Sequence, residues 1–260
     1  MAKKRADILL YKSGQAKSRE YAKRLIMEGV VYVDTIRVMK PGDFYEEDTV
    51  FNLKNSNLKY VSRGGLKLEK ALSAFNIVLK DKICADFGAS TGGFTDCMLQ
   101  NGAKKVYSID VGYGQIDYKL REDDRVILME RTNIRYLNSD EIKEKLDFIS
   151  IDVSFISLEL ILPKAFENLN NNGSIVCLIK PQFEAGREKV GKKGIVKSKD
   201  VHFEVVEKIY NFVEDYDYKM TAIEKSPITG AKGNVEFLAL IEKSDCGLLL
   251  TDLEELIYKS

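Results

Sequence analysis

The chain has 260 residues, of which 45% are hydrophobic and 31% are charged, and its formal net charge is zero. This composition is typical of a soluble globular protein, and no apolar run approaches the roughly 20 residues that a membrane-spanning helix needs. The first residues lack the layout of a signal peptide, so we expect a cytoplasmic protein. Four cysteines without a CxxC pair and a single histidine argue against a metal site, and we expect none.

The zero net charge hides an uneven distribution of charge along the chain. Residues 1–63 hold 13 basic and 8 acidic side chains, whereas the remaining 197 residues hold 27 and 32. A second basic segment, residues 180–199, holds 7 basic and 2 acidic side chains. Such segments are often only solvated loops, but two of them in one chain favour a polyanionic partner.

The first part of the chain predicts a small α+β unit. The segments "RADILLYKSG" and "SREYAKRLIMEGV" fit two short helices, the second capped by Ser18. "VVYV" and "DTVFNL" fit strands, with a turn at "KPGD" between them. The polar segment "KNSNLKYVSRGG" then fits a linker. We predict a small domain over residues 1–58, a linker over residues 59–65 and a larger domain over residues 66–260.

Beyond residue 66, segments typical of strands and of helices alternate along the chain. This alternation indicates an α/β domain with a mostly parallel sheet and helices on both faces. The last two predicted strands, "YKMTAIEKSPI" and "NVEFLALIEK", are joined by "TGAKG", which is too short for a helical crossover. They therefore form a hairpin, and one strand near the sheet edge runs antiparallel. A seven-stranded mixed sheet with this ending is the layout of Rossmann-like methyltransferases.

One segment, "ADFGASTGGF" (residues 85–94), predicts a strand that leads into a glycine-rich turn and a helix. Its glycines do not fit the G-x-G-x-x-G pattern of dinucleotide sites. The wider turn fits S-adenosylmethionine, whose amino-acid tail the backbone of a glycine turn can hold. Asp110, at the end of the next strand, can accept hydrogen bonds from ribose hydroxyls. The alternative is a turn and an aspartate with purely structural roles.

Charged residues at other strand ends indicate which kind of acceptor group is methylated. Asp152 and Lys180 end two successive predicted strands, so both should lie near the donor sulfonium. Glu236 is expected within the last strand, and Lys67 opens the helix ahead of the first. A hydroxyl acceptor must lose a proton as it attacks. A neutral lysine could take that proton, or a cationic lysine could stabilise the developing alkoxide, with the aspartate tuning it.

Other interpretations of these residues fit less well. The chain has "DVSF" where enzymes that methylate an exocyclic amine usually carry N/D-P-P-Y/F. Cys177, the candidate nucleophile for methylating a pyrimidine carbon, is expected to be buried in mid-strand. His202 is expected on a surface helix rather than in a Ser-His-Asp triad. A lysine or aspartate at a strand end is also often only a helix cap or a surface charge.

Several segments together resemble one family, the hemolysin A-like or TlyA-like ribosomal RNA methyltransferases. They are "YVSRGGLKL", "DFGASTGGFTD", "DVGYGQ", "ERTNIR", "IDVSFISL", "LIKPQFEAG" and "GNVEF". The first part, with "SREYAKRLIMEGVVYVD" and "KPGD", resembles the S4 RNA-binding domain of those proteins. The resemblance implies an FtsJ-like domain that methylates ribose 2′-hydroxyls of cytidines in ribosomal RNA. It also implies that Lys67, Asp152, Lys180 and Glu236 form a catalytic tetrad.

The expected binding residues fall into two sets. The S-adenosylmethionine site is predicted to comprise Asp86, Gly88, Ala89, Ser90, Thr91, Gly92, Gly93, Phe94, Asp110 and Glu130. Contacts to RNA phosphates are predicted for Lys17, Arg19, Lys23, Arg24, Arg63, Arg187, Lys189, Lys192 and Lys193. Ribosomal RNA in ribosomal subunits is the expected partner. The alternatives are a non-catalytic RNA-binding or ribosome-assembly protein with a methyltransferase fold, and a membrane-active hemolysin.

Overall fold

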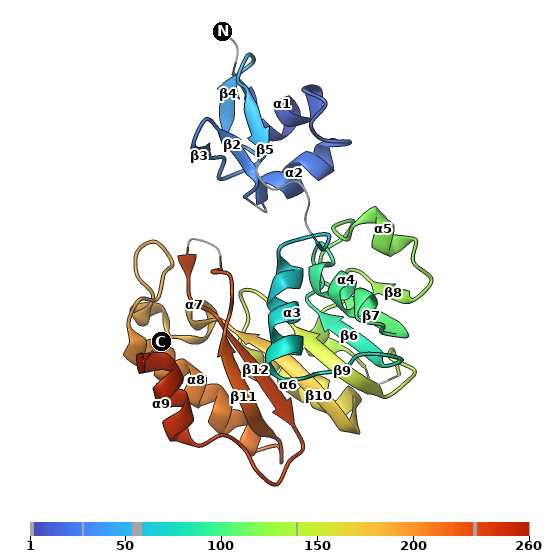
Figure 1. Cartoon of the computed structure of the whole chain (residues 1–260), viewed down its shortest axis with the longest axis vertical. Coiled ribbons are helices and arrows are strands. Elements are labelled where there is room, and N and C mark those ends of the chain that lie inside the picture. The colour runs from blue at the N-terminus through green and yellow to red at the C-terminus, as the bar shows by residue number, and fades with distance from the viewer. Residues whose placement is uncertain (1–2, 28, 54–58, 139, 231–232, 260) are drawn as a thin grey trace. The chain divides into compact units, whose positions relative to one another are not determined.

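A computed structural model of the chain describes residues 3–27, 29–53, 59–138, 140–230 and 233–259 (Figure 1). The chain divides into two compact units, Met1–Arg63 and Gly64–Ser260. The boundary predicted at residue 58 lies outside the described residues. Among the described residues, no helix combines the length and the apolar character that crossing a membrane requires.

The N-terminal unit packs short helices against small antiparallel sheets. Strand β2 lies between β3 and β5, and β1 pairs with β4. The predicted cap of α2 is confirmed, because the Oγ of Ser18 accepts a hydrogen bond from the backbone N–H of Tyr21 at 3.1 Å. The elements are β1 (Lys3–Arg5), α1 (Ala6–Lys12), α2 (Arg19–Met27), β2 (Val31–Val33), β3 (Ile36–Arg37), β4 (Phe44–Glu46) and β5 (Phe51–Leu53).

Strands β1, β3 and β4 were not predicted, because two or three residues are too few to show an alternating pattern. Burial explains why they form nonetheless. Leu10, Ile26, Val31 and Phe51 lie in one apolar core that the helices and strands enclose. Short strands of this kind are stabilised by packing more than by their own propensity.

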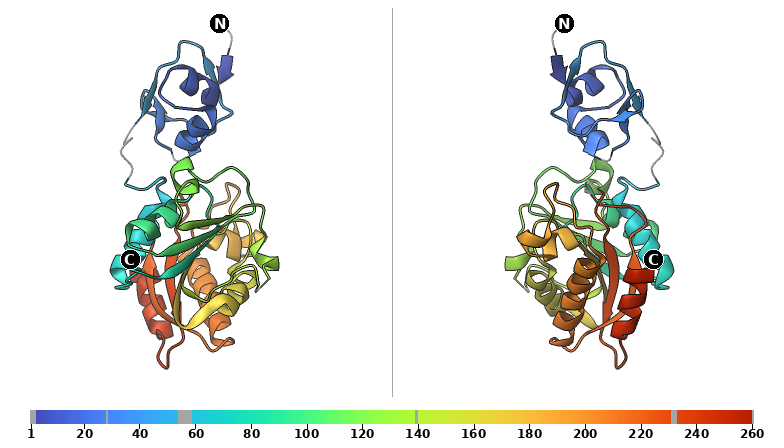
Figure 2. Two further views of the ribbon diagram at one scale, coloured as in Figure 1. Left: turned by 90° about the vertical axis from the view of Figure 1, so that its right-hand side faces the viewer. Right: turned by 90° about the vertical axis from the view of Figure 1, so that its left-hand side faces the viewer.

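The C-terminal unit alternates strands and helices. Its first half comprises α3 (Gly64–Ala74), β6 (Ile83–Phe87), α4 (Gly93–Gln100), β7 (Lys105–Ile109), α5 (Tyr118–Arg121), β8 (Val126–Met129) and β9 (Leu146–Ile151). Its second half comprises α6 (Leu162–Asn168), β10 (Leu169–Ile179), α7 (Pro181–Glu184), α8 (Lys199–Glu214), β11 (Lys219–Lys225), β12 (Phe237–Glu242) and α9 (Leu250–Lys259). Helices cover both faces of the central sheet, with α3 and α4 on one side and α6 and α8 on the other (Figure 2).

The central sheet has seven strands in the order β11-β12-β10-β9-β6-β7-β8. Strand β12 runs antiparallel to both of its neighbours, and the other pairs are parallel. The predicted seven-stranded mixed sheet is therefore confirmed. The predicted "TGAKG" connection includes residues 231 and 232, which lie outside the described residues.

The face of the sheet toward α6 and α8 holds a large apolar core. Phe87, Ile151 and Ile179 from three adjacent strands pack there with Leu162 of α6 and Ile209 of α8. Alternate residues of each strand point to opposite faces of the sheet.

Several local predictions are wrong in detail. Gly64 and Gly65, assigned to the linker, begin α3. His202 lies in the first turn of a helix, α8, as predicted, but it is buried, and its Nε2 forms a hydrogen bond with the carbonyl of Val196 at 3.1 Å. Burial lowers the pKa of His202, which suits a structural residue. The C-terminal helix α9 was not predicted, and its Leu253 packs into the core.

Candidate active site

The register of the parallel strands gathers several strand ends at one edge of the sheet. Ile151, the last residue of β9, pairs with Phe87 of β6 and with Cys177 of β10. The backbone N–H of Asp152 then donates to the carbonyl of Phe87 at 3.0 Å. Asp152 and Lys180 directly follow β9 and β10, so both lie at the edge where the glycine turn begins.

Strand β12 brings Glu236 to the same edge from the opposite direction. Ile179 pairs with Phe237 in antiparallel register, so the residues one step further, Lys180 and Glu236, lie opposite each other. Glu236 is thus not within the last strand, as predicted, but directly before it. Only the pairing of two strands that are distant in sequence reveals this position.

The four predicted catalytic side chains form a continuous chain of ion pairs. The Nζ of Lys180 lies 2.5 Å from Oδ1 of Asp152, and the Nζ of Lys67 lies 3.7 Å from Oδ2 of the same carboxylate. The Nζ of Lys67 also lies 2.7 Å from Oε2 of Glu236. The Nε2 of Gln182 donates to Oε1 of Glu236 at 3.1 Å. Positive and negative charges therefore alternate through the cluster, which we call the tetrad.

Burial makes the pairing within the tetrad necessary. The side chains of Lys180, Lys67 and Glu236 are only 7%, 10% and 3% exposed, whereas Asp152 is 21% exposed. Burial opposes ionisation of Asp152, but the ammonium groups of Lys180 and Lys67 outweigh it and lower the pKa of the carboxyl. Asp152 is therefore an anion at neutral pH, and it is the most exposed member of the tetrad.

Further hydrogen bonds fix the ammonium group of Lys180. Its Nζ donates to the carbonyl of Val153 at 2.7 Å and to the Oγ of Ser154 at 3.1 Å. Pro181 follows at the first position of α7, where a proline fits a helix start. These contacts and the ion pair to Asp152 give Lys180 one defined position.

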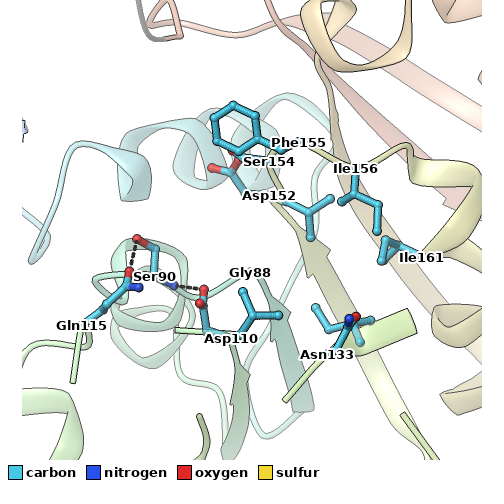
Figure 3. A pocket seen from close by; sticks show the side chains of 13 residues that line it. Gly88, Ser90, Asp110, Gln115, Asn133, Asp152, Ser154, Phe155, Ile156 and Ile161 are labelled. Atoms are coloured by element: carbon cyan, nitrogen blue, oxygen red, sulfur yellow. Dashed lines mark hydrogen bonds between the residues drawn. The ribbon is translucent and has the colours of Figure 1, made fainter. Parts of the chain in front are cut away.

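A pocket of about 430 Å³ opens beside the tetrad (Figure 3). Gly88, Ser90 and Asp110 line one side of it, and Asp152 and Phe155 line the other. Apolar side chains complete the wall, namely Val111, Ile134, Val153, Ile156 and Ile161. Among the four tetrad residues, Asp152 is the one that lines this pocket.

Asp110 is held firmly in the pocket wall. One carboxylate oxygen accepts the backbone N–H of Ser90 at 2.8 Å, and the other accepts that of Gly112 at 2.7 Å. Each oxygen of a carboxylate can accept more than one hydrogen bond, so both keep capacity for a ligand hydroxyl. This position after β7 is the one expected for a carboxylate that binds ribose.

Asp86 lies outside the pocket lining although it was predicted to bind the donor. Its carboxyl is buried and accepts hydrogen bonds from the backbone N–H and Oγ1 of Thr95 and from the Oγ of Ser150. Burial raises the pKa of Asp86 to about 7 against the opposing effect of these donors. Asp86 therefore ties β6 to the start of α4 rather than facing the pocket.

Gly92 and Glu130 also lie outside the lining. Gly92 has φ of +90°, and a Cβ there would lie 2.3 Å from Cδ1 of Leu120, so local packing requires a glycine. Glu130 accepts hydrogen bonds from the backbone of Gly114 and from Arg121, both at 2.7 Å. The remaining predicted donor residues outside the lining are Ala89, Thr91, Gly93 and Phe94.

Several lining residues were missed by the sequence analysis. They are Val111, Gln115, Asn133, Ile134, Val153, Ser154, Phe155, Ile156 and Ile161. Most of them follow β7, β8 or β9 within a few residues, so the rule that ligands lie beyond strand ends could have found them. Phe155 is the most unusual, because it has φ of +64° and the residue is 89% exposed.

The residues predicted to contact RNA lie partly in intramolecular contacts. In the N-terminal unit, Lys17 and Arg24 lie over the ring of Tyr21, and Arg19 pairs with the buried Asp7 at 3.2 Å. Lys23 pairs with Glu20 and Lys189 pairs with Glu204, whereas Arg187, Lys192 and Lys193 are exposed and Arg63 is half-buried. Within the described residues, no group of three His, Cys, Asp or Glu side chains is arranged to hold a metal ion.

Comparison with known proteins agrees with this geometry. Residues 60–243 match the FtsJ-like methyltransferase family, and residues 4–50 match the S4 domain. The 16S/23S rRNA (cytidine-2′-O)-methyltransferase TlyA of Mycobacterium tuberculosis is 38% identical over 98% of this chain and 96% of its own. Hemolysin A of Brachyspira hyodysenteriae is 43% identical over 90% of this chain and 98% of its own.

A solved structure agrees as well. A candidate hemolysin from Streptococcus thermophilus, 48% identical, has a TM-score of 0.79 and covers 100% of this chain and 96% of its own. The resemblance seen in the sequence is confirmed. The chain belongs to the FtsJ-like methyltransferases, in the group of TlyA-like and hemolysin A-like proteins that join an S4 domain to the methyltransferase domain.

Proposed function

We propose that this protein methylates the ribose 2′-hydroxyl of a cytidine in ribosomal RNA, with S-adenosylmethionine as the methyl donor. The observation that carries the proposal is the alternating-charge tetrad, whose Asp152 lines the same pocket as Asp110. The name of the TlyA relative supports the nucleotide and the RNA class. The S4 domain supports binding of RNA in general.

The pocket fits the chemical groups of the donor. Asp110 suits the ribose hydroxyls, because its oxygens are fixed by backbone N–H groups and keep free lone pairs. The turn at Gly88 and Ser90 suits the amino-acid tail, and the apolar wall suits the adenine ring. When bound, the donor supplies an electrophilic methyl group on a sulfonium.

Lys180 is the residue that we assign to the acceptor hydroxyl. As the hydroxyl oxygen attacks the methyl group, the C–O bond forms, the C–S bond breaks, and the oxygen becomes positively charged unless it loses its proton. Lys180 in its unprotonated form accepts that proton, and the ammonium that results is stabilised by the carboxylate of Asp152. Asp152, whose pKa is lowered, is a weak base. We therefore assign to it the orientation of Lys180 rather than removal of the proton.

Lys67 and Glu236 extend the tetrad away from the pocket. Lys67 contacts both carboxylates, so it holds Asp152 from the side opposite Lys180. Glu236 compensates the charge of Lys67 and is itself held by Gln182. Both are positioning residues in this proposal.

Basic side chains on the surface supply the contacts to the RNA backbone. The exposed basic residues of both units contact RNA phosphates, which adds affinity without reading sequence. The protein then works on ribosomal subunits in the cytoplasm.

The test is methyl transfer to ribosomal subunits from cells that lack the gene. Purified protein and donor should methylate one or a few ribose positions, and the same positions should be unmethylated in those cells. A Lys180→Ala variant controls for contaminating activity. Tight binding of subunits without any turnover would replace the proposal with the assembly-protein alternative. Leakage of lipid vesicles without methyl transfer would favour the hemolysin alternative.

A further inference from the structure

A second pocket, of about 390 Å³, shares Phe155 with the donor pocket. It is lined by Phe155, Gln182, Phe183, Ala185, Arg187 and Val190. All but Phe155 come from α7, which is labelled in Figure 1, and from the residues directly after it, all within the basic segment 180–199. No residue of this pocket other than Phe155 lines the donor pocket.

The second pocket lies next to the tetrad. Phe155 is a wall of both pockets. Gln182 donates to Glu236, and Lys180 directly precedes α7, with its Nζ 5.8 Å from the centre of the Phe183 ring. A molecule in the second pocket therefore lies next to whatever the tetrad acts on.

The walls of the second pocket suit a nucleotide. The rings of Phe155 and Phe183 lie 4.8 Å apart at an angle of 48°, and they present aromatic surface. Arg187 adds an exposed guanidinium at the start of the basic segment. Single-stranded nucleic acids are bound by this combination, with bases stacked on aromatic rings and phosphates beside cations.

The second pocket is also held in shape by buried polar contacts. The carboxylate of Glu184 accepts hydrogen bonds from the Oγ of Ser157 at 2.6 Å and from the backbone N–H of Leu158 at 2.7 Å. Its side chain is 2% exposed, and Lys208 lies 3.5 Å from it. Glu184 thus fastens the loop that carries Phe155 to α7.

We propose that the second pocket holds the nucleotide next to the methylated one, with its base against Phe183 and its phosphate beside Arg187. The inference rests on the proposed function, because it places the methylated ribose at the tetrad. It adds that the enzyme contacts two successive nucleotides and is selective for the second as well as the first. Affinity for the neighbouring base then depends on α7, and not on the donor pocket.

The experiment compares Phe183→Leu with Phe203→Leu, a matched change of a half-buried phenylalanine on α8 that lines neither pocket. The kcat/KM of methyl transfer is measured on ribosomal subunits with the natural sequence and with each neighbour of the mapped ribose changed in turn. We expect Phe183→Leu to lower kcat/KM about 10-fold, because stacking on the ring is removed, while Phe203→Leu leaves it unchanged. Changing one of the two neighbouring nucleotides should slow methyl transfer by the wild type, and the same change should slow methyl transfer by Phe183→Leu less.

Two further variants keep the test decisive if Phe183→Leu folds poorly. Ala185→Phe should fill the pocket, and Arg187→Gln should remove the phosphate contact, each with a similar decrease in kcat/KM and unchanged donor affinity by calorimetry. Equal rates for wild type and all three pocket variants would overturn the inference and leave the proposed function standing. A decrease in donor affinity in Phe183→Leu would also overturn it. Absence of methyl transfer by the wild type would instead overturn the proposed function.

Discussion

Two aspartates on neighbouring strands of the central sheet have opposite electrostatic environments. Asp86 belongs to β6, and Asp152 directly follows β9, which pairs with β6. Asp86 accepts hydrogen bonds from neutral hydroxyl and N–H donors, and burial, together with the negative charge of Asp152, raises its pKa to about 7. Asp152 has Lys180 and Lys67 beside it, and its pKa is lowered in spite of burial.

The difference shows how charge partners separate a structural carboxyl from a candidate catalytic one. Hydrogen bonds from neutral groups hold Asp86 in place but do not compensate the loss of water around a full charge. The two ammonium groups do so for Asp152, which can therefore stay ionised beside the pocket. Both aspartates were predicted as site residues, and the groups in contact with each carboxyl distinguish their roles.

The largest expected effect is on the free energy of unfolding, which should depend on pH through the ionisation of Asp86. An unfolded chain releases this proton near pH 4, whereas the folded chain keeps it until about pH 7. The stability that depends on Asp86 is therefore fully present below about pH 4 and is lost as the pH rises to 7. Asp86→Asn does not titrate, so it should gain roughly 4 kcal/mol on the wild type across this window. Denaturant unfolding of both proteins at several pH values measures it.

Asp152→Asn is the matched control, because the pKa of Asp152 is shifted in the other direction. The stability that depends on Asp152 is present above its unfolded pKa of about 3.9 and is lost as the pH falls through its lower folded pKa. At neutral pH the free energy of unfolding should thus be higher than in the wild type for Asp86→Asn and lower for Asp152→Asn. The first difference should develop between about pH 4 and 7, and the second should disappear below about pH 4. The same pH dependence in both would break the comparison.

The next largest expected effect is on the rate of methyl transfer, and it concerns Lys180, which pairs with Asp152. Lys180→Ala removes a group that acts mainly in the transition state, so the single-turnover rate should fall about 100-fold or more. Donor and RNA affinity should change little. Lys180→Arg should not restore the rate, because a guanidinium has a different shape and stays charged. A near-normal rate for Lys180→Ala at saturating enzyme would remove Lys180 from the mechanism, and weaker RNA binding alone would make it a phosphate contact.

A smaller effect concerns donor affinity. Asp110→Ala should weaken binding of S-adenosylmethionine by about 1–3 kcal/mol, because it removes an acceptor for the ribose hydroxyls. Calorimetric titration measures this, with thermal unfolding as the check on the fold. Gly92→Val is a poor test of the same site, since its added side chain would collide with Leu120. Unchanged affinity in Asp110→Ala would contradict the donor site.

The smallest effect concerns the basic segment after α7. Replacing Lys192 and Lys193 by Gln should weaken binding to ribosomal subunits. The slope of log affinity against log salt should fall by about 0.7 for each RNA phosphate that a lysine no longer neutralises. Lys259→Gln is a control, because that lysine already pairs with Glu255 at 2.9 Å. An unchanged slope in the double variant would show that the two lysines do not bind RNA.

Much of the site could be predicted because strand ends are visible in a sequence. Asp110, Asp152 and Lys180 each follow a short apolar run, and parallel strands end at a common edge. The prediction of pocket residues failed where the direction of a side chain decides its role. Asp86 lies one residue before the end of its strand, and only the fold shows that its side chain turns toward α4 instead of the pocket.

The sequence by itself determined the order of the elements, the mixed seven-stranded sheet and the family. These follow from apolar periodicity, from connection length and from short motifs, which are local properties of the chain. The grouping of Lys67, Asp152, Lys180 and Glu236 as a tetrad was implied by the family resemblance. The tertiary structure decided that Glu236 lies opposite Lys180, that Asp86 is structural and that Phe155 lines two pockets. Those facts depend on register and burial between segments far apart in the chain, because the energy of a charge or an aromatic ring is set by its spatial neighbours.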